Sequence, residues 1–242
     1  EGTHSSNGRE IPREKNLGSR NNRSAMMGST TKYISGLLMP PPSHRFCLYD
    51  EMGNGSNFQY LRKVLETSKR NGSDVRLFIQ PAHAYLLEVL RILGMMKDYE
   101  KWQYELITLV EDVNERYPES RETPLWDFGG YNSVTMTEVP PPENPNRLMR
   151  WYGDIGHYDK TLGDLIQDRI FSFNQAGRVI PEDFGVQISS ENIDRYQTLQ
   201  KNKQKEYTQT YQEDIKELTG RVNTIKNKIR PFDCHQVATG SK

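Results

Sequence analysis

Cysteine is scarce in this sequence, with two residues, Cys47 and Cys234, among 242. They lie far apart in the chain, so they either pair in an oxidising compartment or remain free thiols. A structural zinc site needs four ligands, and Cys234 with its neighbour His235 supplies only two. The cysteine content therefore excludes a zinc site built from cysteines alone.

An excess of charge of either sign is also absent, because 32 basic residues balance 32 acidic ones. Nothing in this balance indicates nucleic-acid binding. Apolar runs of membrane-spanning length and signal-peptide patterns are missing as well. Because the sequence starts at Glu1 rather than at a methionine, we expect a processed or partial chain, with any membrane anchor upstream of Glu1.

Hydrophobic residues make up only 34% of the chain, and the mean hydropathy is −0.82. These values predict a core in part of the chain and polar, weakly packed ends. The aromatic share of 10% argues against disorder throughout. We expect a flexible polar segment at 1–45, an α/β domain at 46–188 and a helical extension at 189–242.

Helical and strand patterns alternate from residue 57 onward. The first clear helix ends at Asn71-Gly72, and an apolar strand follows at once, an order that is typical of an α/β fold. Strands are expected at 46–49, 75–79, 124–128 and 183–188. Helices are expected at 58–70, 84–96, 99–116, 160–173, 191–218 and 221–229.

Candidate functional residues lie just beyond two of the expected strands, where functional groups gather in open α/β sheets. His83 follows the strand at 75–79, and its structural alternative is a cap on the next helix. Asp127 ends the strand at 124–128, and its structural alternative is a carboxylate that binds loop amides. Both are candidate substrate-binding residues.

Asp154 and His157 lie three residues apart in the loop before the helix at 160–173. At this spacing the imidazole can take a proton from a serine hydroxyl while a carboxylate fixes its tautomer. In a chain with five histidines, such an aspartate arises by chance in roughly one chain in four. The spacing alone therefore does not establish a catalytic role, and the neighbouring sequence has to support it.

This order of elements resembles the C-terminal half of SGNH/GDSL-type hydrolases, over roughly residues 57–175. In that family an Asp-x-x-His motif precedes the last helix, and its Asp and His complete the catalytic triad. The resemblance implies a partial three-layer, flavodoxin-like sheet with flanking helices, followed here by a long polar helical extension. It also implies that Asp154 and His157 are catalytic.

Three shorter stretches are similar to uncharacterised bacterial proteins with a membrane anchor and an SGNH-like domain, and to domains of envelope polysaccharide O-acetyltransferases. The stretches are Trp-Asp-Phe-Gly-Gly-Tyr-Asn at 126–132, Met-Arg-Trp-Tyr at 149–152 and Gly-His-Tyr-Asp-Lys-Thr-Leu-Gly at 156–163. This similarity implies a location in the bacterial cell envelope, on the periplasmic side of the inner membrane, and a glycan or acyl-ester substrate. We expect no cofactor.

The family's nucleophilic serine, in a Gly-Asp-Ser-type turn, and its oxyanion-hole residues are not recognisable in this sequence. Asn132 follows the strand expected to be the last, so it is not the family's asparagine. The roles carried over are therefore limited to His157 as general base and Asp154 as its orienting partner. We expect the chain by itself to be inactive, or nearly so, on ester substrates.

Aromatic residues near the motif are candidates to line a sugar-facing cleft, with packing in the core or a loop as their alternative. These residues are Tyr131, Trp151 and Tyr152.

Two other classes of function remain open. The chain is alternatively a catalytically inactive SGNH-like binding or scaffold module, whose C-terminal helix presents Tyr196, Tyr207 and Tyr211 to a protein partner or else packs on its own domain. A metal-dependent hydrolase is the third hypothesis, although no tight motif supports a metal site. Its ligands would be His83, Asp127, Asp154 and His157.

Overall fold

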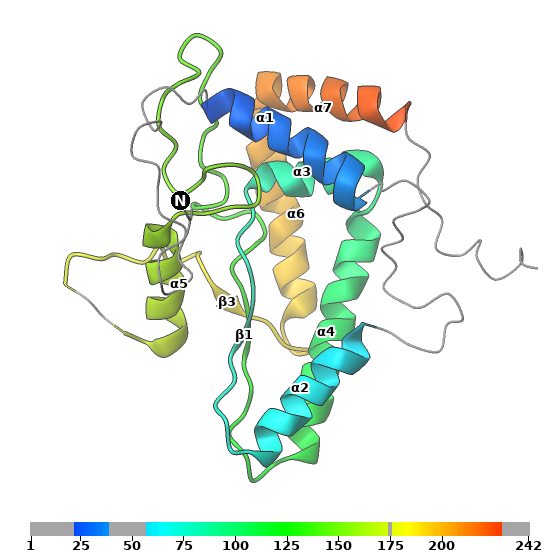
Figure 1. The fold of residues 1–242 in the computed structure, drawn as a ribbon, viewed down its shortest axis with the longest axis vertical. Coiled ribbons are helices and arrows are strands. Elements are labelled where there is room, and N and C mark those ends of the chain that lie inside the picture. Colours follow the sequence, from blue (N-terminus) through cyan, green and yellow to red (C-terminus); the bar gives the residue numbers. More distant parts are fainter. Residues whose placement is uncertain (1–21, 39–56, 174–175, 229–242) are drawn as a thin grey trace, which may run out of the picture.

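The computed structural model describes residues 22–38, 57–173 and 176–228, which form helices around a small sheet (Figure 1). The helices are α1 (Asn22–Tyr33), the π-helical turn η2 (Ile34–Leu38), α2 (Phe58–Arg70), α3 (Ala84–Leu93), α4 (Met96–Arg116), α5 (Lys160–Phe171), α6 (Ile193–Thr210) and α7 (Gln212–Lys226). The strands are β1 (Leu77–Ile79), β2 (Leu125–Asp127) and β3 (Val186–Gln187). The strand expected at 46–49, Cys47 and Cys234 lie outside the described residues.

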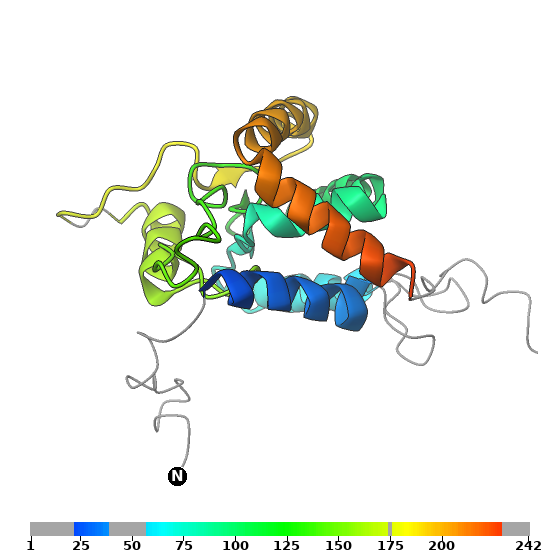
Figure 2. The ribbon, with the colours of Figure 1, turned by 90° about the horizontal axis from the view of Figure 1, so that it is seen from above.

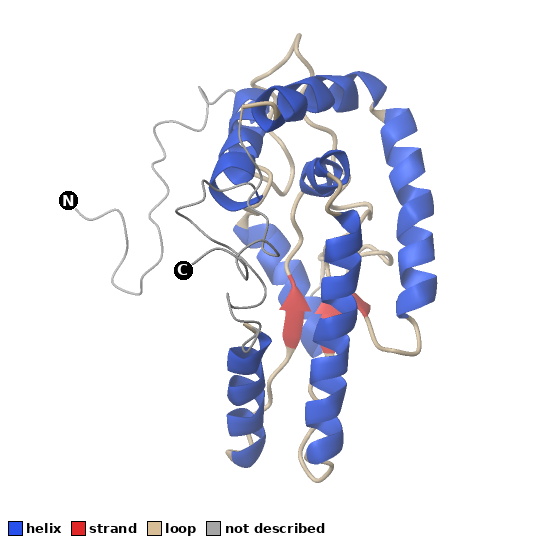
Figure 3. Ribbon diagram, turned by 90° about the vertical axis from the view of Figure 1, so that its right-hand side faces the viewer, coloured by secondary structure: helices blue, strands red, loops and turns tan. Residues whose placement is uncertain are grey.

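The three strands form one mixed sheet in the order β1-β2-β3 (Figure 3). β1 and β2 are parallel, with Leu77 opposite Leu125, and α3 and α4 make the crossover between them. β3 is antiparallel to β2, with Gln187 opposite Trp126. The predicted mixed α/β character is therefore confirmed.

Side chains of β2 alternate between two packed clusters, because successive residues of a strand point to opposite faces. Leu125 packs with residues of α2, α4 and α6. Trp126 and Phe128 pack instead with residues of α5. Helices thus cover both faces of the sheet, and Asp127, which hydrogen-bonds Gln103 of α4, faces the side of α4 and α6.

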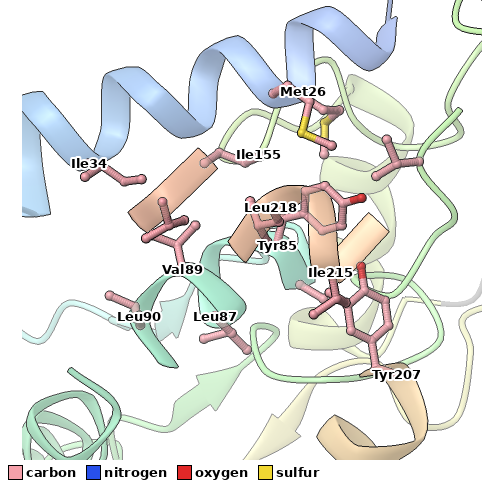
Figure 4. Packing of buried hydrophobic residues seen from close by; sticks show 14 of the residues in the cluster. Met26, Ile34, Tyr85, Leu87, Val89, Leu90, Ile155, Tyr207, Ile215 and Leu218 are labelled. Carbon is pink, nitrogen blue, oxygen red and sulfur yellow. The ribbon is translucent and has the colours of Figure 1, made fainter. Parts of the chain in front are cut away.

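Helices α1, α3 and α7 pack together beyond one end of the sheet (Figures 1 and 2). Figure 2 shows α7 crossing from the end of α6 over α3 toward α1. The cluster between them is apolar, with Met26, Val89 and Leu218 fully buried (Figure 4). At the edge of this cluster, Arg23 of α1 pairs with Asp214 of α7 at 2.8 Å and also binds Glu217.

The expectation of a flexible segment at 1–45 is wrong for residues 22–38, which form α1 and η2. Met26, Met27, Thr30 and Ile34 are buried, and their spacing places them on one side of the helical segment. Helix α1 is otherwise mostly polar, so its helical pattern is weak in the sequence. Its order comes from packing against α3 and α7.

The C-terminal region contains two helices that divide at Tyr211, where the backbone leaves the helical region with φ −115° and ψ 44°. The single helix expected at 191–218 is therefore wrong, and the helix expected from 221 is the end of α7. Tyr196 and Tyr207 are buried against the rest of the chain, so the packed alternative holds for these two residues. Among the described helices, none combines the length and apolar character that crossing a bilayer requires.

Gly185 and Gly177 allow a matched test of how tightly the loop before β3 packs. Both have a φ of +83°, but a Cβ at Gly185 would overlap the Phe128 ring, whereas a Cβ at Gly177 would meet open space. We predict that G177A lowers the free energy of unfolding by about 1–2 kcal/mol through backbone strain alone. G185A should cost at least about 1 kcal/mol more through overpacking. Urea unfolding measures both changes. Equal losses of unfolding free energy in G177A and G185A would contradict close packing of Gly185 against Phe128.

Candidate active site

The loop that carries Asp154 and His157 folds back on itself. The Gly153 N–H donates to the His157 carbonyl at 3.0 Å, and the Asp159 N–H donates to the Trp151 carbonyl at 2.7 Å. Tyr152 and Tyr158 form an antiparallel bridge between these bonds. These contacts close a compact turn directly before α5, so the turn and the helix are positioned together.

Asp154 and His157 form the hydrogen-bonded pair that their spacing predicts. The ring Nδ1 of His157 lies 2.9 Å from both carboxylate oxygens of Asp154. The same carboxylate accepts the N–H groups of Gly156 and His157, each at 2.9 Å. Partial burial acts to raise the pKa of Asp154, but these hydrogen bonds outweigh it and hold the pKa below its ordinary value. The carboxylate is therefore charged and fixed in orientation at neutral pH.

The His157 ring is open to solvent on the side away from Asp154. Its side chain is 76% exposed, whereas that of Asp154 is 20% exposed. Within the described part of the chain, the ring hydrogen-bonds only the Asp154 carboxylate, and no serine or threonine hydroxyl reaches it. The orientation of the pair suits a general base, but these residues do not supply its nucleophile.

Ile155 anchors the turn to the apolar core (Figure 4). Its side chain is fully buried in the cluster that α1, α3 and α7 share. Its N–H donates to the hydroxyl of Ser29 at 3.3 Å, and its carbonyl accepts the N–H of His83 at 2.9 Å. The Tyr33 hydroxyl occupies the space where a Cβ of Gly156 would lie. Contacts with α1 and with the start of α3 therefore fix the position of the turn relative to the core.

His83 supports the structure and does not face a substrate. It is fully buried, and its Nδ1 accepts the N–H of Tyr85 at 3.2 Å, which caps α3. Its Nε2 lies 2.7 Å from the Thr137 carbonyl, so Nε2 carries the proton. Burial lowers the pKa of His83 to about 4, against the opposing effect of Thr137. The helix-cap alternative is thus confirmed, and a substrate-binding role does not fit this burial.

Asp127 is a buried carboxylate on the opposite side of the sheet from α5. Its oxygens accept the N–H of Gly129 at 2.7 Å and the amide of Gln103 at 2.9 Å. Burial raises its pKa to about 6, although these bonds and one from Tyr196 act to lower it. The expected bond to a loop amide is present. Asp127 also borders a pocket of about 220 Å³ between α3, α4 and α6.

The three aromatic candidates do not line one cleft beside His157. Trp151 and Tyr152 are buried in the cluster that covers α5, so the core-packing alternative describes them. Tyr131 is also buried, with its hydroxyl donating to Glu88 at 2.7 Å. It borders the same pocket as Asp127.

The predicted metal ligands are not brought together. His83 is a helix cap, Asp127 lies in the pocket, and Asp154 is engaged with His157. Among the residues that the structure describes, no three His, Cys, Asp or Glu side chains are grouped as metal ligands. The metal hypothesis therefore has no site in this part of the chain.

Ser29 and Tyr33 support the turn, but no pattern in the sequence indicates this role. Both lie in α1, which has few large apolar residues and therefore a weak helical signal. The pocket beside Asp127 was also not expected. Its only signal was the glutamine spacing at 197, 200 and 204, which places three amides along one side of α6.

Comparisons of the chain with protein-family models, with curated proteins and with solved structures gave no match.

The contact between Tyr33 and Gly156 can be tested by a double-mutant cycle. We predict that G156A lowers the free energy of unfolding by about 1–3 kcal/mol, because the new methyl group displaces the Tyr33 ring. In a Tyr33→Ala background the same change should cost clearly less. G28A, which adds a methyl group in open space on α1, is the control and should be neutral or slightly stabilising. If the losses of unfolding free energy in G156A and Y33A were strictly additive, Tyr33 would not contact Gly156.

His83 and Asp127 should shift stability in opposite directions at acidic pH. Between pH 6.5 and about 4 the unfolded chain protonates His83 but the folded chain does not, so this residue removes up to about 3 kcal/mol of stability as pH falls. Asp127, with a folded pKa of about 6, takes up its proton first in the folded chain, so its burial penalty is relieved over the same range. Relative to the parent, H83Q should lose less stability from pH 6.5 to 4.5, and D127N should lose more. Urea unfolding at both pH values checks this, and unchanged slopes in both variants would refute it.

Proposed function

We propose that the chain is the C-terminal part of an SGNH-like esterase or O-acetyltransferase that acts on envelope glycans. The observation that carries the proposal is the Asp154–His157 pair. A charged carboxylate held by two backbone N–H groups binds Nδ1 of an imidazole that is otherwise open to solvent. This is the arrangement that a general base requires.

In this mechanism His157 Nε2 takes the proton of a serine hydroxyl as the oxygen attacks an acyl carbon. Asp154 accepts the Nδ1 hydrogen, which fixes the tautomer and stabilises the imidazolium that forms. The imidazolium then returns the proton to the leaving alcohol. Under the proposal, the serine and the oxyanion donors are supplied by a part of the protein other than these 242 residues.

The position of the pair in the fold supports the same assignment. The parallel strands β1 and β2, with helices on both faces, are compatible with part of a three-layer, flavodoxin-like SGNH sheet. The turn with Asp154 and His157 directly precedes α5, as the motif precedes the last helix in that family. The antiparallel β3 and the helices α6 and α7 are additions to that pattern. An envelope location follows from this proposal.

A catalytically inactive SGNH-like binding or scaffold module is the second candidate. It is favoured by one observation: no hydroxyl group within the described residues contacts His157. Any partner surface on α6 would use its exposed side, which includes Leu199, since Tyr196 and Tyr207 are buried.

Ester hydrolysis separates these candidates. We predict that the complete gene product that contains this chain deacetylates or transacetylates a glycan ester, and that H157Q and D154N each lower kcat/KM by about 10²–10⁴-fold. K160A is the control, because Lys160 is exposed and pairs with Asp164 outside the Asp154–His157 pair. The chain alone should be nearly inactive on p-nitrophenyl acetate.

Two outcomes would overturn parts of this proposal. Full activity in H157Q would remove the assigned general base. Substantial esterase activity of the chain alone, lost in H157A, would place the nucleophile within these 242 residues.

A further inference from the structure

A pocket of about 220 Å³ lies between α3, α4, α6 and the turn that follows β2. An apolar cavity of about 150 Å³ holds benzene, so this space suits a ligand of about seven heavy atoms. Leu87 and Met96 supply apolar wall, and the pocket lies beyond the carboxyl end of β2, where ligands bind in open α/β sheets. It is separate from the Asp154–His157 turn and does not depend on its function.

Asp127 at this pocket has no cationic partner among the described residues, although it is only 1% exposed. Its hydrogen-bond donors are neutral: the Gly129 N–H, the Gln103 amide and the Tyr196 hydroxyl. A buried carboxylate usually has a compensating positive charge, because desolvation of an isolated charge is costly. The missing charge can come from a ligand.

The neighbouring carboxylates are already compensated. Glu88 binds Arg91 at 2.7 Å, and Glu100 binds Lys201 at 3.2 Å. The cations near the pocket are therefore engaged with these two partners. Among the described carboxylates at the pocket, Asp127 is therefore the one whose negative charge has no cationic partner.

Three tyrosines from three different segments border the same space: Tyr99 from α4, Tyr131 from the turn after β2, and Tyr196 from α6. Burial raises the pKa of all three above its ordinary value, so the rings stay neutral. Neutral aromatic rings attract cations through their electron-rich faces. The amides of Gln197 and Gln103 are engaged with each other, and Gln103 in turn orients Asp127.

We propose that this pocket binds a small organic cation, a primary or quaternary ammonium of about seven heavy atoms. The Asp127 carboxylate supplies the counter-charge, and the three tyrosines border the space that the cationic group would occupy. An uncharged ligand of the same shape would leave the carboxylate uncompensated and would therefore bind more weakly.

The test compares choline with its uncharged isostere 3,3-dimethyl-1-butanol, by calorimetry or NMR titration of the full chain. Choline should bind at least about tenfold more tightly than the isostere. D127N should weaken choline by about tenfold or more, whereas E119Q, which removes the same charge from an exposed residue, should leave binding unchanged. Choline affinity should also fall below about pH 6, as Asp127 takes up a proton.

A second variant keeps the test decisive if D127N folds poorly. Y99L retains the carboxylate and apolar volume but removes one ring, and should weaken choline several-fold while the isostere is little affected. Equal binding of choline and the isostere, no binding of choline at millimolar concentration, or equal effects of D127N and E119Q would each overturn the proposal.

Discussion

The geometry of the candidate site depends on the burial of Ile155. Its side chain is fully enclosed between α1 and α3, and its two backbone polar groups are bonded to Ser29 and His83. With this residue fixed, its neighbours in the turn have little freedom, and Asp154 and His157 are presented at the surface as a pair. A partly buried carboxylate and an exposed imidazole are thus positioned by an apolar core, which tolerates little displacement because it is closely packed.

Two aspartates of the chain illustrate opposite effects of environment on a carboxyl group. At Asp154, hydrogen bonds from two N–H groups and an imidazole outweigh partial burial. At Asp127, burial outweighs three neutral hydrogen bonds. The Asp154 carboxylate is suited to stabilising the imidazolium of His157. The Asp127 carboxylate is suited to binding a cationic ligand. The same residue type therefore supports two different proposals within one fold.

Strongly periodic elements could be predicted from the sequence, as at α2, α4 and α5, because their apolar residues repeat at helical spacing. The Asp154–His157 bond could also be predicted, since both residues lie in one turn. The burial of His83, Trp151 and Tyr152 could not, because it depends on which segments pack over them. α1 was missed for the same reason: its helix is stabilised by distant partners and not by its own composition.

The pairing of α1 with α7 joins residues as far apart as Arg23 and Glu217, which are separated by 194 positions. During synthesis α1 leaves the ribosome long before α7 exists, so Met26 and Ile34 lack part of their final cover until α7 has been made. Closure of so long a loop is slow relative to local helix formation. Because α1 has few apolar side chains, it exposes little apolar surface to other nascent chains before α7 is made. The polar composition that makes α1 hard to predict from the sequence is thus compatible with its late incorporation into the core.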